Sequence, residues 1–432
     1  MSENKNIFIN KKILIYGLGK TGISTFKFLK KKNYILLFDD NKKIKFDKSI
    51  NANIKNLSQI KKTKLDLIII SPGIDKNKCK LKNFLKKFSK KTYTDLDVFY
   101  SFYKNKCITI TGTNGKSTTC QLIHNVFKKK GIDVKLAGNI GYPILSIKNI
   151  KPKSVFVIEA SSYQLDYSQL FSSKYAALLN ISPDHLERHK SFKNYISAKF
   201  KLVENQTNNS TVFINRFDKN ICSRIIKSKH KSKIIKVNTK LSKKYLRNFQ
   251  NDYFSSLSNQ ENLSFVIEIS KKFNIKNKLL FDVVNRFRGL KYRQQIILKN
   301  KNFSIINDSK STSYSSSIEM LKRKNITYWI LGGIPKKGDK FNLSKDYYKN
   351  IKGYIFGEQN KKFVSDLKNK IEFKKFSNLR KALDAVMEEI KIDNYHKKTI
   401  LFSPSGASFD SFKNFEERGS YFNKLIKKNL NG

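Results

Sequence analysis

Residues 107–120, which read CITITGTNGKSTTC, combine the residue types of a phosphate-binding loop. Alternating Ile and Thr residues predict a buried strand, a turn at 112–115 follows, and 116–118 begin a helical pattern. In such a loop, backbone N–H groups and the helix N-terminus face an anion, the lysine neutralises it, and the next hydroxyl can hold Mg²⁺. The usual P-loop has a glycine where this chain has Ile110. The loop is therefore a shortened variant, and an ordinary strand–turn–helix is the alternative.

Two further polar groups follow apolar runs that predict neighbouring strands. Glu159 follows the run at 154–158, and Asp184 and His185 come shortly after the run at 175–181. Because the C-terminal ends of parallel strands meet at one edge of a sheet, these groups are expected beside the loop. A carboxylate and an imidazole facing a phosphate cradle suit a Mg-nucleotide site. Taken singly, Glu159 could cap a helix and His185 could make a structural hydrogen bond.

A second nucleotide signal lies near the N-terminus. A strand at 12–16 opens into GLGKTG at 17–22, and the next strand, at 34–38, ends at Asp39. This βαβ pattern is of the dinucleotide-binding type, although one residue is missing from the usual glycine spacing. A third strand, at 65–70, ends in the turn SPGI. The pattern indicates a Rossmann-like nucleotide site, and NAD is only one of its possible ligands.

The order of these elements predicts an α/β protein of three domains. The expected domains are a Rossmann-like N-terminal domain at 1–97, a central P-loop-type ATPase domain with a mainly parallel sheet at 98–288, and a C-terminal Rossmann-like α/β domain at 289–432. Further strands are expected at 211–214, 233–237, 303–307, 327–331, 353–356 and 399–402, and residues 240–290 have a mostly helical pattern.

Composition narrows the class of protein. The chain has 432 residues, of which 39% are hydrophobic, and a formal net charge of +55. The lysines are spread over nearly every segment, which favours a generic basic surface over a specific nucleic-acid site. No apolar run is long enough to span a membrane, no signal peptide is recognisable, and the four cysteines form no CxxC motif. We expect a cytoplasmic protein with free thiols and without membrane insertion.

The motifs together resemble the Mur ligases, ATP-dependent amide-forming enzymes of peptidoglycan synthesis. Similar segments of the central domain are GTNGKST (112–118), GNIG (138–141), EASSYQL (159–165), NISPDHLERH (180–189) and YISAK (195–199). The D-glutamate-adding branch of the family is resembled by GLGKTG, SPGI (71–74), NDSKST (307–312) and SPSGASFDSFKNFEERG (403–419). The resemblance covers essentially the whole chain.

The resemblance implies a reaction in which ATP activates UDP-N-acetylmuramoyl-L-alanine as an acyl phosphate and D-glutamate then attacks it. It implies two Mg²⁺ ions, small-molecule substrates and a monomer. Lys116, His185 and Lys199 are the implied catalytic residues. The implied Mg²⁺ ligands are Ser117, Glu159, His185 and Lys199. Because an ammonium cannot bind a cation, Lys199 is expected to be carbamylated; the alternative is a surface lysine on an amphipathic helix.

The resemblance also assigns binding residues. Those for ATP are Gly112, Thr113, Asn114, Gly115, Lys116, Ser117, Thr118, Asn259, Asn262, Arg293 and Asp308. Those for the UDP substrate are Lys20, Thr21, Asp39, Gly73 and Asn139. Those for D-glutamate are Thr312, Lys336, Ser408 and Phe415.

Three positions depart from the family pattern. Ser258 stands where a histidine is usual, Tyr292 stands where the joint usually has histidine before arginine, and Gln295 stands where a glutamate is usual. These changes bear on adenine contacts and on domain closure.

Parts of the sequence are also compatible with three other functions. The first is another ligase of the superfamily, such as a folylpolyglutamate synthetase or a different Mur ligase. The second is a basic, nucleic-acid-stimulated NTPase, which only the diffuse charge favours. The third is an NAD oxidoreductase, disfavoured because no second catalytic pair accompanies GLGKTG.

Overall fold

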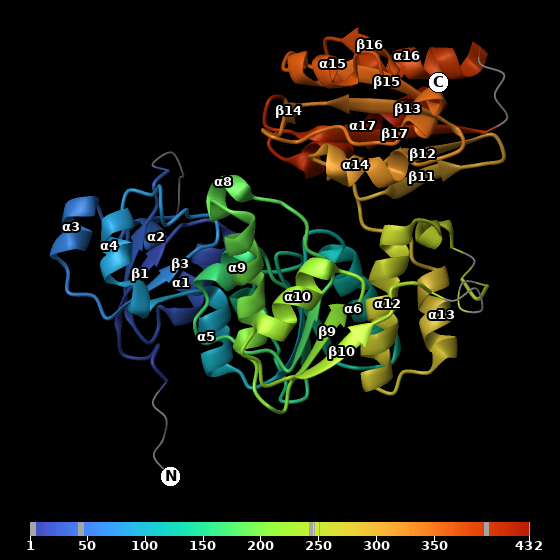
Figure 1. Cartoon of the computed structure of the whole chain (residues 1–432). Coiled ribbons are helices and arrows are strands. Elements are labelled where there is room, and N and C mark those ends of the chain that lie inside the picture. Colours follow the sequence, from blue (N-terminus) through green and yellow to red (C-terminus); the bar gives the residue numbers. More distant parts are fainter. Residues whose placement is uncertain are drawn as a thin grey trace. The chain divides into compact units, whose positions relative to one another are not determined.

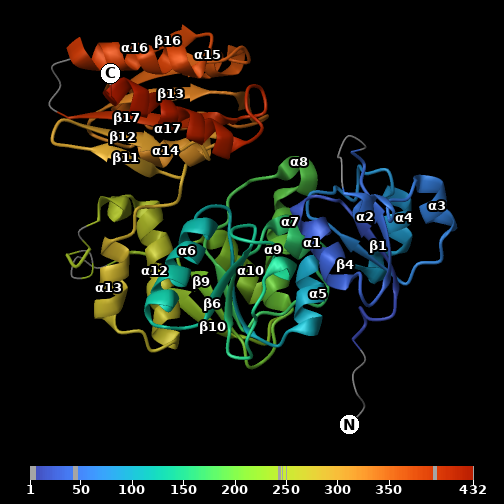
Figure 2. The same ribbon diagram turned by 180° about the vertical axis from the view of Figure 1, so that it is seen from behind.

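The computed structural model describes residues 6–41, 47–241, 245, 247–249, 251–392 and 397–431. The chain forms two compact units: an N-terminal unit of residues 1–249 and 260–284, and a C-terminal unit of residues 250–259 and 285–432. Figures 1 and 2, drawn from opposite sides, show helices flanking the sheets of each unit. The units are described separately below.

The first sheet of the N-terminal unit is parallel, with the strand order β2-β1-β3-β4. Its strands are β1 (Lys12–Tyr16), β2 (Tyr34–Phe38), β3 (Leu67–Ile70) and β4 (Thr92–Tyr93). Its helices are α1 (Lys20–Leu29), α2 (Lys48–Asn51), α3 (Leu57–Lys62), α4 (Lys82–Lys87), η1 (Ser89–Lys91) and α5 (Asp95–Phe102). The continuous Ile and Leu runs of these strands are typical of parallel strands that are covered on both faces.

The second sheet is also parallel, with the order β10-β9-β8-β5-β7-β6. Its strands are β5 (Lys106–Thr111), β6 (Val134–Gly138), β7 (Val155–Glu159), β8 (Tyr175–Leu178), β9 (Thr211–Asn215) and β10 (Lys233–Val237). The helices that follow β5 are α6 (Lys116–Lys129), η2 (Ile144–Ser146), α7 (Ser162–Tyr167), α8 (Leu186–His189), α9 (Phe192–Glu204), α10 (Lys219–Lys227), η3 (Asp252–Ser255), α12 (Leu257–Lys272) and α13 (Asn277–Asn285). Strand β5 lies between β7 and β8, so the strand order reverses there, and ligands bind beyond such a point in open α/β sheets.

The C-terminal unit holds a third sheet, with the order β11-β12-β17-β13-β15-β16. Its strands are β11 (Gln295–Lys299), β12 (Phe303–Asn307), β13 (Ile326–Gly332), β14 (Ile334–Pro335), β15 (Ile351–Phe356), β16 (Glu372–Phe376) and β17 (Lys398–Ala407). Strand β11 runs antiparallel to β12, and β14 antiparallel to β17; the other pairs are parallel. The helices are α14 (Tyr314–Leu321), η4 (Lys345–Asn350), α15 (Lys361–Leu367), α16 (Leu379–Ile392) and α17 (Phe415–Asn431).

The first two sheets share one hydrophobic core. A single cluster of buried side chains runs from the first sheet through α1 and α5 into the second sheet. At the junction, the rings of Phe99 on α5 and Phe156 on β7 lie 4.7 Å apart. The C-terminal unit has its own two clusters. The shared core explains why the first two sheets belong to one compact unit.

The predicted α/β class with three sheets is confirmed. The predicted domain boundaries after residues 97 and 288 stay a prediction, because the two compact units do not separate the first two sheets. The strands missed from the sequence are short or lie at sheet edges: β4, β6, β11, β14 and β16. In the part of the chain that the structure describes, no helix is both long and apolar enough to cross a membrane.

A buried carboxylate fastens α5 to the segment that follows α7. One oxygen of Asp97 accepts hydrogen bonds from the Ser168 hydroxyl and from the backbone N–H groups of residues 169–171, at 2.6–3.0 Å. The other oxygen accepts from the backbone N–H of Thr94, at 2.8 Å. Asp97 is fully buried. These bonds fix α5 against the segment that joins α7 to β8 of the second sheet.

We expect Asp97→Ala to lower the free energy of unfolding by at least about 3 kcal/mol, because it leaves several buried donors without an acceptor. Chemical denaturation monitored by circular dichroism measures this loss.

Asp95, on the same helix, is the matched control. It is also buried, but neither of its oxygens has a hydrogen-bond partner in the described ranges. Burial raises the pKa of Asp95 from 3.8 to about 6. Its contribution to stability is therefore complete below pH 3.8 and is lost as the pH rises through about 6. At pH 8, Asp95→Asn should leave stability unchanged or increase it; an equal loss in both variants would contradict the role of Asp97.

Candidate active site

The loop at 112–115 joins β5 to α6 as the sequence predicts. Gly115 is the N-cap of α6, with a φ of +82° that favours glycine. A Cβ atom at this position would lie 1.9 Å from Oδ1 of Asn262 on α12. The loop backbone and the Asn262 side chain therefore approach each other so closely that a methyl group at position 115 would displace one of them. The same contact places Asn262 against the loop.

The side chains of Asn180 and Tyr195, which were not among the predicted site residues, bind the loop. Oδ1 of Asn180 accepts hydrogen bonds from the backbone N–H groups of Thr113 (3.2 Å) and Asn114 (2.8 Å). The hydroxyl groups of Thr113 and Tyr195 lie 3.0 Å apart. Asn180 closely follows β8, which pairs with the loop strand, and this neighbouring position was the signal that could have found it.

Ser117 and Glu159 meet beneath the loop. The Ser117 hydroxyl donates to Oε2 of Glu159 at 2.6 Å, and the Asn139 amide donates to Oε1 at 3.0 Å. Glu159 is 1% exposed. A hydroxyl and a carboxylate side by side are oxygen ligands of the kind that Mg²⁺ prefers. Asn139 therefore lies next to the expected metal ligands.

Lys199 extends from α9 into the same place and is 1% exposed. Its Nζ donates to the carbonyl oxygen of Gly112 at 2.7 Å, and Nζ of Lys116 donates to the same oxygen at 2.8 Å. Burial lowers the pKa of Lys199 well below its ordinary value, and the charge of Lys116 lowers it further, while Asp184 and Glu159 oppose the shift. The neutral amine is thus accessible at a lower pH than for an ordinary lysine.

His185 lies in the turn after β8, at the N-cap of α8, in a left-handed conformation with a φ of +53°. Its Nε2 lies 3.4 Å from Oδ2 of Asp184, and its Nδ1 lies 3.7 Å from Oε1 of Glu187. Within the described ranges, no group of three or more His, Cys, Asp or Glu residues is arranged to hold a metal ion. Mg²⁺ binding therefore needs further ligands, and the donor set fits it through Ser117 and Glu159.

Four of the five predicted residues for the UDP substrate lie at the ends of the first sheet, whereas the fifth, Asn139, lies beside Glu159 at the second sheet. Lys20 and Thr21 begin α1. Oδ2 of Asp39 accepts the backbone N–H of Leu18, in the glycine loop, at 2.6 Å. Gly73 lies in the exposed turn after β3, with open space where a side chain would stand. Three of these residues thus gather at the glycine loop, and Gly73 follows the neighbouring strand.

In the C-terminal unit, Asp308 follows β12. Its carboxylate accepts hydrogen bonds from the backbone N–H of Gln294 (3.1 Å) and from the Ser403 hydroxyl (3.2 Å). Burial raises the pKa of Asp308 to about 7, against the effect of the Arg293 charge. The Asn259 amide donates to Oε1 of Gln294 at 2.9 Å. Asn259, Gln294 and Asp308 thus form one hydrogen-bonded group.

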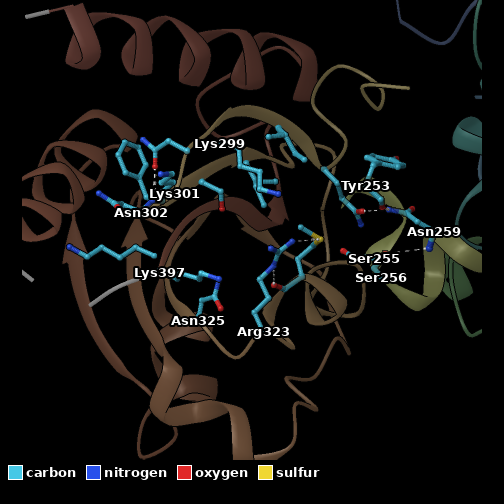
Figure 3. Close-up of a pocket in the computed structure, with 18 residues that line it drawn as sticks. Tyr253, Ser255, Ser256, Asn259, Lys299, Lys301, Asn302, Arg323, Asn325 and Lys397 are labelled. Carbon is cyan, nitrogen blue, oxygen red and sulfur yellow. Dashed lines mark hydrogen bonds between the residues drawn. The ribbon is translucent and has the colours of Figure 1, made fainter. Parts of the chain in front are cut away.

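A cavity of about 550 Å³ opens beside this group, and Figure 3 shows Tyr253 and Asn259 at one side of it. Its lining includes no acidic residue among the described ones. It does include five basic side chains: Lys299, Lys301, Arg323, Lys397 and Lys398. The positive charge of its lining suits an anionic ligand, and the rest of this basic chain carries charge of the same sign.

The predicted D-glutamate residues also lie in the C-terminal unit, after strand ends. Thr312 follows β12, Lys336 follows β14, and Ser408 follows β17. Phe415 begins α17, and Nζ of Lys310 lies 4.4 Å from the centre of its ring. These residues are on different loops of one sheet edge.

Arg418, which is not among the predicted site residues, links these loops by hydrogen bonds. It is fully buried and donates to the backbone oxygens of Gly406 (3.0 Å) and Ser309 (2.8 Å). Burial lowers its pKa to about 10. Its position in the recognised tail was the available signal.

The departures from the family pattern keep local bonds. Oε1 of Gln295 accepts the backbone N–H of Tyr292 at 3.1 Å, as a glutamate oxygen could. The Tyr292 ring lies against Gly419, where a Cβ atom would come within 2.4 Å of it. The Ser258 hydroxyl lies 3.4 Å from that of Ser256.

The loop residues, Glu159, His185, Lys199 and the predicted UDP-substrate residues belong to the N-terminal unit. Asn259, Arg293, Asp308 and the predicted D-glutamate residues belong to the C-terminal unit. Each set is brought together within its own unit. The predicted site residues are therefore divided between the two units.

We expect Gly115→Ala to weaken Mg-ADP binding at least about tenfold, a loss of about 1.4 kcal/mol, because the new methyl group must displace Asn262 or the loop. Titration calorimetry measures the affinity. Gly131→Ala is the matched control, because Gly131 follows the same helix with a φ of +83° and has nothing within 4 Å. Both variants carry left-handed strain of about 1–2 kcal/mol, so equal losses of affinity would contradict the contact argument.

Two family models match segments of this chain. Residues 110–281 match the model of the Mur ligase middle domain. Residues 11–89 match the model of the MurD-like N-terminal domain of Mur ligases. Both matches fall on segments whose glycine loops are described above.

Solved structures share the fold. MurC from Thermotoga maritima covers 97% of this chain and all of its own, with a TM-score of 0.56 and 15% identity. MurF from the same organism, solved with ADP, covers 98% of this chain and 99% of its own, with a TM-score of 0.56 and 12% identity. A UDP-N-acetylmuramoylalanine–D-glutamate ligase of Rickettsia felis is 35% identical over 98% of both chains. With that identity over nearly its whole length and with two family models matched, this chain belongs to the Mur ligase family.

Proposed function

We propose that this chain is an ATP-dependent ligase that joins D-glutamate to UDP-N-acetylmuramoyl-L-alanine during the synthesis of peptidoglycan precursors. The names of its relatives, at up to 35% identity over 98% of the chain, support this substrate pair. The observation that carries the proposal is the buried Lys199 amine beside Lys116 and the Ser117–Glu159 pair. An ordinary nucleotide-binding loop has no need of a second, buried lysine.

The reaction must make a carboxylate into an acyl donor. An oxygen of the alanine carboxylate attacks the γ-phosphorus of ATP, and the bond from that phosphorus to the bridging oxygen breaks, so that ADP leaves. The amine of D-glutamate then attacks the acyl carbon, and the C–O bond to phosphate breaks. The products are the amide, ADP and phosphate, with one proton released. Catalysis of such transfers depends on positioning and on charge stabilisation.

The chain's own groups divide this work. The N–H groups of the loop and the Lys116 ammonium would hold the β- and γ-phosphates. Ser117, Glu159, His185 and a carbamylated Lys199 would hold two Mg²⁺ ions, which neutralise phosphate charge when bound. The lowered pKa of Lys199 favours reaction of its neutral amine with CO₂, and the carbamate supplies an anionic oxygen ligand. Imidazole is an uncommon Mg²⁺ ligand, so the assignment of His185 rests on the family resemblance.

The C-terminal unit would bring the amino acid. D-glutamate carries two carboxylates, so its site needs at least one cation and several hydrogen-bond donors. Lys336, Thr312, Ser408 and the backbone at Phe415 offer them. Asp308 and Arg293 would contact ATP from the same unit. The residues proposed to bind ATP come from both units, so both units are needed for the reaction.

Phosphate release from ATP tests the function directly. Each substrate is omitted in turn, and each of several amino acids replaces D-glutamate. We expect release only with UDP-N-acetylmuramoyl-L-alanine and D-glutamate together. Release with a different amino acid would indicate another Mur ligase, release with a folate would indicate a folylpolyglutamate synthetase, and release that depends on nucleic acid would indicate the basic NTPase.

We expect Lys199→Ala to lower turnover at least about 100-fold, because it removes the group proposed to supply an anionic metal ligand beside the phosphates. Small carboxylates such as formate should restore part of the activity by replacing the carbamate. Steady-state phosphate release measures both effects.

Lys201→Ala is the control for Lys199. Lys201 lies two residues further along α9 and pairs with Asp166 at 3.8 Å, away from the loop. Its loss should leave turnover within a factor of about two. Full activity of the Lys199 variant would refute the carbamate role, and so would a rescue by carboxylates that is equal in the two variants.

A further inference from the structure

Arg188 lies on the short helix α8, three residues after His185, and its guanidinium crosses to the first sheet of the same unit. Its Nη2 donates to the backbone oxygens of Pro72 (2.7 Å) and Ile74 (2.5 Å), and its Nη1 donates to that of Gly73 (3.3 Å). One side chain thus binds three consecutive carbonyl groups in the turn after β3. In the described part of the chain, no carboxylate lies within ion-pair distance of Arg188, so these carbonyls are its main acceptors.

The turn that Arg188 holds is the one that contains Gly73. A trans peptide unit is planar, with its N–H directed opposite to its C=O. Because Arg188 takes the carbonyl of Pro72, the N–H of Gly73 is turned to the other side. Gly73 is exposed, with open space where a side chain would stand. Arg188 therefore fixes the direction in which this N–H meets a ligand.

The guanidinium also lies over an aromatic ring. The centre of the Tyr163 ring is 4.0 Å from Cζ of Arg188, a distance at which a cation is attracted to a ring face. Tyr163 also packs against His185, with ring centres 5.0 Å apart, and it stacks on His189 at 5.4 Å. Arg188 thus also supports the position of His185.

The same contacts continue to the phosphate loop. His189 is buried and packs edge-on against Tyr195, with ring centres 5.4 Å apart. Tyr195 in turn reaches Thr113 of the loop at 3.0 Å, and Nζ of Lys199 lies 4.6 Å from the centre of its ring. A continuous chain of packed side chains therefore joins the Gly73 turn to the phosphate loop and to the buried Lys199.

We propose that Arg188 is a positioning residue that sets the Gly73 turn and His185 in one fixed geometry, so that the acyl end of the UDP-linked substrate meets the γ-phosphate. This inference rests on the proposed function. A displacement of about 1 Å of the reacting groups in such a site can lower the rate about 100-fold. Arg188 touches neither reactant in this account; it acts through Gly73, Tyr163 and His185.

Arg188→Ala and Arg188→Lys test the proposal by a split of kinetic constants. For Arg188→Ala we expect kcat/KM for the UDP-linked substrate to fall about 100-fold, while KM for D-glutamate changes less than about twofold, since D-glutamate is assigned to the other unit. Arg188→Lys keeps the charge but not the planar fork, so we expect a fall of about tenfold. Ethylguanidine should restore part of the activity of Arg188→Ala and none of the activity of Arg188→Lys.

Arg224→Ala is the matched control. Arg224 also combines a hydrogen bond to an oxygen (Glu204, 2.9 Å) with a ring contact (Phe200, 5.6 Å), but it lies on α10. Its kinetic constants should match those of the unmodified chain. Unchanged constants in both Arg188 variants would overturn the proposal. So would equal losses for all three substrates accompanied by a lowered melting temperature in Arg188→Lys, because that pattern is purely structural.

Binding of the UDP-linked substrate without ATP, measured by titration calorimetry, separates this proposal from the proposed function. If the unmodified chain does not bind the UDP-linked substrate and releases no phosphate with D-glutamate, the proposed function fails and this inference fails with it. In the other case, the unmodified chain binds the UDP-linked substrate and releases phosphate with D-glutamate. If Arg188→Ala then shows the same affinity for the UDP-linked substrate and the same turnover, only the role of Arg188 fails.

Discussion

One carbonyl oxygen, that of Gly112, accepts hydrogen bonds from two lysines, and the rest of the site depends on this arrangement. Lys116 reaches it from the helix that follows the loop, and Lys199 reaches it from α9. Two ammonium groups on one oxygen, one of them buried, repel each other strongly where water is excluded. The repulsion is relieved when Lys199 loses its proton or when anions join the pair. The fold therefore creates a place that selects for negative charge before any ligand arrives.

The surrounding residues keep this arrangement from collapsing. Asn180 binds the loop from the neighbouring strand, and Asn262 fills the space beside Gly115, so the loop cannot move away from the lysines. Ser117 and Glu159 offer oxygen atoms below it. Ser117 begins α6, Glu159 ends β7 and Asn180 follows β8, while Asn262 lies within α12. Rigid elements thus hold groups that would separate if they were on free loops.

The sequence was informative where local pattern decides structure. The glycine loop, the buried strands around it and the placement of Glu159 next to Ser117 follow from strand ends that meet at one edge. The edge strand β16 was missed because its sequence, EFKKF, carries lysines instead of a continuous apolar run. Arg188 and Asn180 lie in the motif at 180–189, but neither was assigned a role, because their partners are 114–116 and 66–67 residues away in the chain and the motif does not show what each side chain contacts. No linker marks the predicted domain boundary near residue 97, since a largely buried helix, α5, passes directly from one sheet to the other.

The shared core of the first two sheets has a consequence for how this chain can be divided. A fragment that begins after α5 would expose the apolar side of the second sheet that α1 and α5 now cover, and it would be prone to aggregate. In the C-terminal unit, both faces of the sheet are covered by hydrophobic clusters made of the unit's own residues. Recombination between relatives should therefore exchange the last third of the chain freely and inherit the first two thirds as one block. The C-terminal unit can thus change its sequence while the phosphate loop and its supporting residues stay intact.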